Sequence, residues 1–176
     1  TINNVSYNIT TDSDGVAKLN INLIPGNYIL TVYNPYNGEE KAFNLTIKSL
    51  IVENHDLTKY YRNSSQFSVK VLNNQGYPAI HENVTFNING VFYTRCSDNN
   101  GYVSLSIMLL PGDYIVTIFF NDDSTSNWIH VLPTLVTHDL IMNYMDGSKF
   151  RAKVLDSQGK PSCNKKVSFN QKGFLV

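Results

Sequence analysis

The chain contains an internal repeat, and this feature limits its fold more than any other. Residues 56–93 match residues 139–176 at an offset of 83, with 15 identities in 38 positions. Residues 1–33 match residues 87–119 at an offset of 86, with 14 identities in 33 positions. A solenoid repeat has only about 20 to 50 residues, so the longer period predicts a string of small independent domains.

The two alignments divide the chain into one complete copy of the repeat and two partial copies. We expect the C-terminal part of a copy at 1–52, a complete copy at 53–135 and the N-terminal part of a third copy at 136–176. The joints are only a few residues long, so neighbouring copies should be stacked semi-rigidly. Each partial copy is too small to be stable alone, and we expect their open strand edges to pair between chains, head to tail.

Within the complete copy, apolar and polar residues alternate in seven strand-length stretches, at 57–61, 67–72, 84–88, 91–95, 103–108, 114–119 and 128–132. The segments between them carry Asn and Gly, as in Asn89-Gly90, which supply the positive φ angles of tight hairpins. No segment shows the apolar period of a helix. The pattern predicts an all-β fold of tandem immunoglobulin-like β-sandwich repeats. The expected core is Leu57, Phe67, Val69, Val71, Val84, Phe86, Val103, Leu105, Ile107, Tyr114, Val116, Ile118, Val131 and one of Trp128 and Ile129.

The charge of the chain argues against two large classes of partner. Lys and Arg number 14 and are balanced by 14 Asp and Glu, so the formal net charge is zero. A nucleic-acid-binding or peripheral membrane protein needs a basic surface, so we expect neither partner. The longest apolar runs, such as 115–120, fall far short of the ~20 residues of a membrane span, so we expect no membrane insertion in this segment.

The sequence lacks the usual catalytic and cofactor-binding patterns. It contains no nucleophile elbow, glycine-rich phosphate loop or HExxH pattern. Cys96 and Cys163 align with Thr10 and Ile80 of other copies, so we interpret them as two unrelated single thiols. We therefore expect a chain that is not an enzyme and needs no cofactor.

Two acidic turns resemble the start of a calcium loop. Asp12 and Asp14 precede Gly15, and Asp98 precedes Gly101 at the equivalent position of the next copy. A calcium loop also needs a distal carboxylate, and no Glu follows at the required spacing. A hairpin turn with a left-handed glycine is the simpler interpretation, and calcium binding is the alternative.

Several short motifs of the complete copy occur together in a known kind of repeat. They are Phe67-x-Val69-Lys70-Val71, Gly76-x-Pro78, Asn87-Ile88-Asn89-Gly90, Asp98-x-x-Gly101 and Pro111-Gly112-x-Tyr114. In these motifs the chain resembles the tandem immunoglobulin-like repeats of adhesin-like surface proteins of gut methanogenic archaea and, more distantly, the bacterial Ig-like repeats of invasin-type adhesins. The resemblance implies secretion, display at the cell surface in long arrays, and a role in attachment or spacing.

The stretch from Asp98 to Tyr114 is also similar to part of the Cna protein B-type domains, some of which close a Lys–Asn isopeptide bond beside a buried acid. This similarity implies Lys59 and Asn127 as such a pair. However, the acid would fall at Ile118, and Met142 replaces Lys59 in the next copy. A surface lysine and an asparagine at the entry of a strand remain the alternative.

Two further groups of residues have both a structural and a functional interpretation. Asn-x-Ser/Thr sequons make glycosylation an alternative on a secreted chain, with Asn63 as the most accessible candidate beside Asn83 and Asn44. Outward tyrosines either cover cross-strand neighbours or form a platform for sugar rings, and the candidates are Tyr60, Tyr93 and Tyr102.

These observations predict a structural and adhesive repeat of an extracellular, cell-surface protein, which acts as a stalk or spacer and presents a binding region. The expected partners are neighbouring repeats of the same chain and a host or cell-surface ligand, of which a glycan is one kind. A carbohydrate-binding β-sandwich module that uses exposed aromatic residues is the alternative function.

Overall fold

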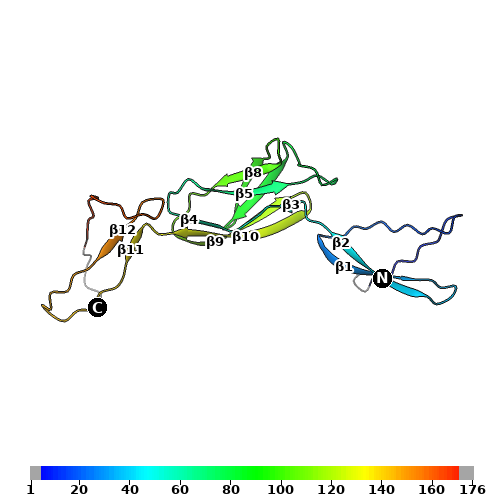
Figure 1. Cartoon of the computed structure of the whole chain (residues 1–176), viewed down its shortest axis with the longest axis horizontal. Coiled ribbons are helices and arrows are strands. Elements are labelled where there is room, and N and C mark those ends of the chain that lie inside the picture. Colours follow the sequence, from blue (N-terminus) through cyan, green and yellow to red (C-terminus); the bar gives the residue numbers. More distant parts are fainter. Residues whose placement is uncertain (1–4, 171–176) are drawn as a thin grey trace.

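The computed structural model describes residues 5–170, and within that range it contains strands and no helix. The strands are β1 (Gly26–Tyr33), β2 (Glu40–Ile47), β3 (Ile51–Val52), β4 (Leu57–Tyr60), β5 (Gln66–Val71), β6 (Asn83–Ile88), β7 (Val91–Cys96), β8 (Tyr102–Ser106), β9 (Gly112–Phe120), β10 (Asp123–Leu132), β11 (Leu135–Thr137) and β12 (Ala152–Val154). Figure 1 shows a central sandwich, with β1 and β2 beyond one end and β11 and β12 beyond the other. The predicted all-β fold is confirmed.

Two facing sheets make up the central sandwich. One has the order β4-β10-β9-β6-β7, and the other has the order β3-β5-β8. All the neighbouring strands are antiparallel except β4 and β10, which run parallel. The strand alternation places every second residue between the two sheets, so the core forms from both inner faces.

The core of the sandwich agrees with the prediction from alternation. Phe67 of β5 meets Phe86 of β6 edge to face, with ring centroids 6.2 Å apart, and this contact joins the two sheets. Burial of such a ring contributes about 2 to 3 kcal/mol. Ile129 fills the inward position on β10, and Trp128 points outward. The predicted core residues are buried or pack against the core, and the structure adds Ile51, Ala79, Ile88 and Phe120.

The hairpin between β9 and β10 is tighter than the sequence predicts. The polar run 121–124 suggests a loop, with the next strand beginning at Trp128. In the structure β10 begins at Asp123, which pairs with Phe120. Asn121 adopts a positive φ of 52°, which a two-residue hairpin turn requires and which Asn tolerates. The turn at Asn89-Gly90, with φ angles of 51° and 80°, forms as predicted.

A short strand follows each of the two joints, and the two short strands pair in the same way. Ile51 of β3 pairs with Val71 of β5, and Leu135 of β11 pairs with Val154 of β12. β3 thus lies just before the predicted boundary at 53, and β11 begins one residue before the predicted boundary at 136. The division of the chain into three parts itself stays a prediction.

The recurring Pro-Gly-x-Tyr motif has a structural cause. The Tyr114 hydroxyl donates to the carbonyl oxygen of Leu110 at 2.9 Å, and the Tyr28 hydroxyl donates to that of Ile24 at 2.8 Å. In both copies the tyrosine side chain thus binds the backbone four residues before it, just ahead of the strand. A tyrosine corner makes the same kind of bond in immunoglobulin-like sandwiches.

Candidate functional site

The outer side of the five-stranded sheet carries four exposed large apolar side chains and a half-buried histidine beside them. We call Phe92, Ile115, Phe119, Trp128 and His130 the outer aromatic face. Trp128 is 46% exposed and stacks on His130, with ring centroids 6.0 Å apart and planes 11° from parallel. Phe92 of β7 lies 6.5 Å from Phe119 of β9, and Ile115 pairs with Trp128 across β9 and β10. The side chains of this face come from β7, β9 and β10, and the face crosses β6, which lies between β7 and β9.

Polar groups hold the strands beneath this face in register. His130 Nδ1 and Asp113 Oδ1 are 2.6 Å apart. The carboxylate of Asp56 accepts hydrogen bonds from the Trp128 backbone N–H at 2.8 Å and from the Asn127 amide at 3.3 Å. These two donors lower the pKa of Asp56, because they favour its charged form. The start of β4 is thereby fixed to β10.

The chemistry of the outer aromatic face suits stacking on a flat apolar surface. Between its rings lie the hydroxyls of Thr117 and Ser126, which are 3.0 Å apart. Aromatic rings bordered by hydroxyl and amide groups can contact the apolar face of a sugar ring and its hydroxyls together. The sequence contained a signal for this face, because Ile129 and Val131 in the core require Trp128 and His130 to point outward.

The tyrosines proposed as a sugar platform do not come together. Tyr93 packs against the core, and the Tyr60 ring lies against Gly159. Tyr102 lies on β8 of the opposite sheet, where its hydroxyl donates to Glu53 at 2.6 Å and its ring lies under the Lys70 amine. This hydrogen bond lowers the pKa of Glu53 and raises the pKa of Tyr102. The platform prediction was wrong for these three residues.

The acidic turns hold their own backbone. Asp12 Oδ1 accepts from the N–H groups of Asp14 and Val16 at 3.0 and 2.9 Å, and Asp98 Oδ1 makes the equivalent pair of bonds. In the described range 5–170, no group of three or more His, Cys, Asp or Glu side chains could hold a metal ion. The structure therefore brings no further carboxylate to Asp12, Asp14 or Asp98, and the hairpin-turn interpretation accounts for their geometry.

Lys59 and Asn127 do not form a pair. Lys59 lies opposite Val131 in the parallel pairing of β4 and β10, whereas Asn127 lies about 13 Å further back along β10. The Lys59 amine donates to the carbonyl oxygens of Ser65 and Ile107, each at 2.9 Å. Asn127 bonds Asn54 and Asp56 instead. The isopeptide prediction was wrong, and so was the surface-lysine alternative, because Lys59 is only 5% exposed.

The three candidate asparagines differ in accessibility. Asn83 and Asn44 lie on the strands β6 and β2 and are exposed. Asn63 is half-buried, and its side chain donates to the carbonyl oxygen of Ser157 at 2.7 Å while it accepts from the Ser65 N–H at 2.8 Å. Asn63 is therefore not the most accessible candidate. The thiols of Cys96 and Cys163 are free and exposed.

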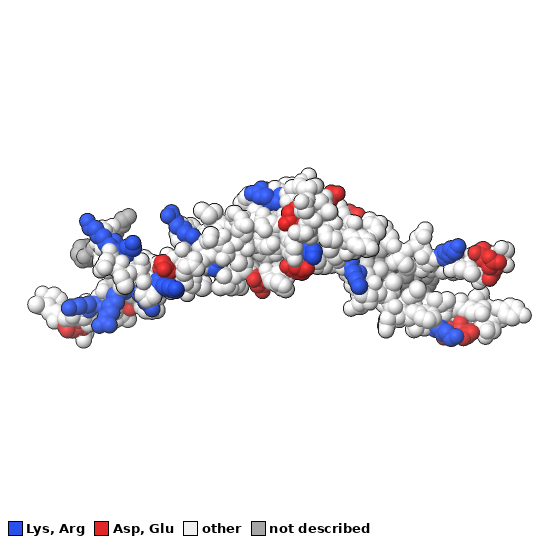
Figure 2. Space-filling view, turned by 45° about the horizontal axis from the view of Figure 1, so that its top comes forward, with Lys and Arg blue, Asp and Glu red and all other residues white. Residues whose placement is uncertain are grey.

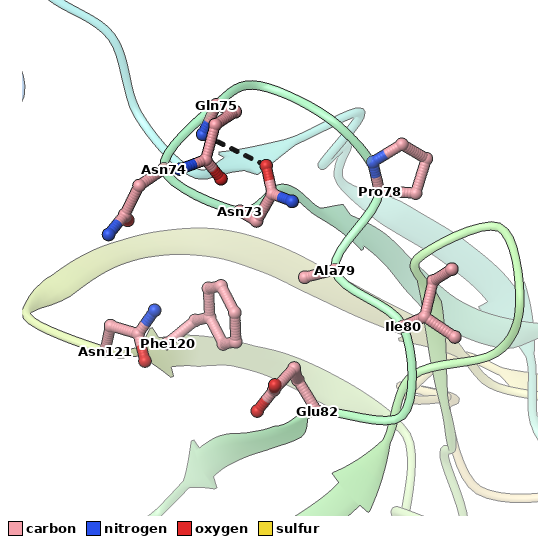
Figure 3. A pocket seen from close by; sticks show the side chains of 9 residues that line it. All are labelled: Asn73, Asn74, Gln75, Pro78, Ala79, Ile80, Glu82, Phe120 and Asn121. Atoms are coloured by element: carbon pink, nitrogen blue, oxygen red, sulfur yellow. Dashed lines mark hydrogen bonds between the residues drawn. The ribbon is translucent and has the colours of Figure 1, made fainter.

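A shallow pocket opens at the end of the sandwich that faces β1 and β2. Its volume is about 400 Å³, and its walls include Asn73–Gln75 of one loop and Phe120 and Asn121 of the β9–β10 turn (Figure 3). Glu82 is its one ionisable wall residue. Charged side chains are sparse and of both signs over the central sandwich in the view of Figure 2, and basic ones gather near β11 and β12. No helix among the described residues is long and apolar enough to cross a membrane.

The comparisons with known proteins give a distant likeness to solved structures. A comparison with models of protein families finds no match, and a comparison with curated proteins also finds none. Among solved structures, the chain is similar to "Structure of surface layer protein SbsC, domains 4-9", with 13% sequence identity and a TM-score of 0.32. The match covers 85% of this chain and 26% of that one, so the chain spans about a quarter of its length. At such a TM-score the function has to be argued from the chain itself.

Proposed function

We propose that the chain is a non-enzymatic stalk or spacer region of an extracellular, cell-surface protein, in which tandem sandwiches hold an adhesive region away from the surface. The observation that carries this proposal is the same strand junction at both joints. Ile51 pairs with Val71 and Leu135 pairs with Val154 in the same way, and Figure 1 shows the β1–β2 pair, the central sandwich and the β11–β12 pair following one another along the long axis. Length then grows with each copy, and the partners of each copy are its neighbours.

The proposal is tested by adding a copy. A second copy of residues 51–134, inserted after Thr134, keeps the Thr134–Leu135 junction on its downstream side and joins the two copies through a new Thr134–Ile51 junction. β10, with 10 residues, spans about 33 Å, so one added sandwich should lengthen the chain by about 30 to 40 Å. The longest dimension from small-angle X-ray scattering measures this. A chain that gains mass without gaining length would contradict a spacer function.

A second candidate function is carbohydrate binding at the outer aromatic face. It is supported by the exposure of Trp128 and its stacking on His130. In β2 the position paired with Ile29, the counterpart of Ile115, is Asn44 rather than tryptophan. The first copy therefore lacks this tryptophan, whereas the joint recurs, and for this reason we place spacing first.

The chain has one tryptophan, so its fluorescence reports on this face directly. Glycans that bind there should shift or quench the Trp128 emission, and Trp128→Ala should abolish binding on a glycan array. Tyr77→Ala removes another exposed aromatic ring, at the far loop, and serves as the matched control. Repeating the glycan array in EDTA tests the acidic turns at Asp12 and Asp98, because EDTA removes calcium and abolishes only binding that depends on it. Binding that survives Trp128→Ala would rule out this face.

A further inference from the structure

The joint between the central sandwich and the third copy is held by a specific contact. We call residues 60–65 the tip loop and residues 156–159 the acceptor turn. The Tyr60 ring lies so close over Gly159 that a Cβ at this position would overlap the ring. The Asn63 amide donates to the carbonyl oxygen of Ser157 at 2.7 Å. An aromatic ring and an amide of one copy thus bind the exposed backbone of the next.

The central copy carries the same turn at residues 73–76. Asn73 Oδ1 accepts from the N–H groups of Gln75 and Tyr77, each at 3.0 Å, just as Asp156 Oδ1 accepts from those of Gln158 and Lys160, each at 2.9 Å. Gly76 has a φ of 83° and Gly159 a φ of 78°, so both glycines lie in the left-handed region. The two turns present the same backbone surface.

The turn at 73–76 has no side chain over its glycine, whereas the Tyr60 ring covers the glycine of the acceptor turn. A Cβ at Gly76 would have no atom within 4 Å, in contrast to Gly159. The described residues before the first joint align with the later strands of the repeat, so they contain no counterpart of the tip loop. The pocket beside Asn73 and Gln75 adds free space at the same end of the sandwich (Figure 3).

We propose that the turn at 73–76 is a docking site for the tip loop of another copy of this repeat. The tyrosine of that loop lies on Gly76, and its asparagine donates to the carbonyl oxygen of Asn74, the counterpart of Ser157. The occupant must carry both side chains. The third copy does not, because Asn143 and Asp146 stand at the positions of Tyr60 and Asn63. The inference rests on the proposed spacer function and adds that neighbouring copies are held at a fixed angle.

The test extends the full chain with a second copy of residues 53–86 placed before Thr1, which supplies the missing tip loop in its natural order. Spin labels at positions 42 and 95, with Cys96 and Cys163 changed to Ser, report the distance distribution across the first joint. Labels at 95 and 165 report the joint that is already filled. We expect the extension to narrow the 42–95 distribution to the width found for 95–165.

Two variants keep this test decisive, because the extension also completes the first sandwich. Tyr→Ala at the added counterpart of Tyr60 should restore the broad distribution without straining the backbone. Gly76→Ala should broaden it in the extended chain and leave it unchanged in the original one. A distribution that stays broad after extension, or stays narrow with the Tyr→Ala variant, would overturn the docking site. The spacer function would survive that result if added copies still lengthen the chain.

Discussion

At the residue scale, Lys59 is the most unusual group of the sandwich. Its amine is buried, and both of its hydrogen-bond acceptors are neutral backbone carbonyls. Burial lowers the pKa of Lys59 below its usual 10.5, because the charged form loses water and gains no carboxylate. The positive charge of Lys59 therefore lowers the stability of the folded state.

This cost predicts a dependence of stability on pH. Between the lowered pKa of folded Lys59 and 10.5, the unfolded chain binds more protons, so the free energy of unfolding should rise with pH and level off above 10.5. The Lys59→Met chain lacks this contribution. Urea unfolding of both chains from neutral pH to pH 10.5 measures the difference, since tyrosine titration affects both alike. A difference that stays constant with pH would contradict the prediction.

Asp123 shows what a sequence cannot reveal about a single residue. The run Asn121-Asp122-Asp123-Ser124 suggests a loop, yet the Asp123 carboxylate is buried and accepts from Ser49 Oγ at 2.6 Å and from the Leu50 N–H at 2.8 Å. These partners lie more than 70 residues away, so no local pattern identifies them. Trp128 and Ile129 are different, because the alternation of β10 settles which one is buried once its neighbours are assigned.

Asp123→Ala should destabilise the central sandwich by about 1 to 3 kcal/mol, because the part-buried Leu50 N–H loses its acceptor and the Ser49 hydroxyl keeps only the Ile51 carbonyl oxygen. Asp122→Ala, at the exposed neighbouring position, should change the stability by less than about 0.5 kcal/mol. Chemical denaturation followed by the emission of Trp128 measures both. Equal effects of the two variants on the free energy of unfolding would show that Asp123 does not anchor the segment that leads into β3.

At the element scale, the strands of the central copy follow from alternation and the turns from their Asn and Gly residues. β3 does not, because two residues show no period and Ile51 becomes a strand residue only by pairing with β5. The outer aromatic face could be inferred from the strands, whereas the contact between the tip loop and the acceptor turn could not. It depends on how two copies meet, and the sequence of neither copy encodes that alone.

The two equivalent turns give a matched pair of variants. Alanine at Gly76 and at Gly159 costs the same left-handed strain, about 1 to 2 kcal/mol, because their φ angles agree. Only Gly159→Ala displaces Tyr60. We expect that variant to shift the NMR signals of the Tyr60 ring and the Asn63 side-chain amide, while Gly76→Ala leaves them in place and lowers the stability of the central sandwich. Unmoved signals in Gly159→Ala would mean that Tyr60 does not rest on the turn in solution.

At the scale of the whole molecule, the central part is the one region of residues 5–170 that has two facing sheets and a common core. β1 and β2 form a two-stranded sheet, as do β11 and β12, and a two-stranded pair alone is marginally stable in water. Apolar residues such as Ile29, Phe43 and Phe150 are exposed there. The repeat alignment anticipated this contrast, because each flank holds only part of the strands of one copy.

Hydrogen exchange should therefore divide the chain into two classes. Amides in β5, β6 and β9 should exchange on the order of 10³-fold more slowly than those in β1, β2, β11 and β12, because only the former need global unfolding to open. Mass spectrometry after timed labelling in deuterated buffer measures this. Raising the protein concentration is the informative control, since pairing of the flanks between chains would protect them. Equal protection of flanks and centre in dilute solution would contradict the expectation.

The parallel pairing of β4 with β10 has a mechanical consequence. The first joint leads into the start of β4, and the end of β10 leads into the second joint. Tension along the chain therefore pulls the start of β4 and the end of β10 in opposite directions. The load then acts along the strands, and the bonds that link residues 57–60 to 129–132 share it and must fail together. Two antiparallel strands pulled from one end would instead open one bond at a time. We therefore expect the joints to yield first, where the units are linked by the short β3, by the bonds of Asp123 to Ser49 and Leu50, and by the acceptor turn.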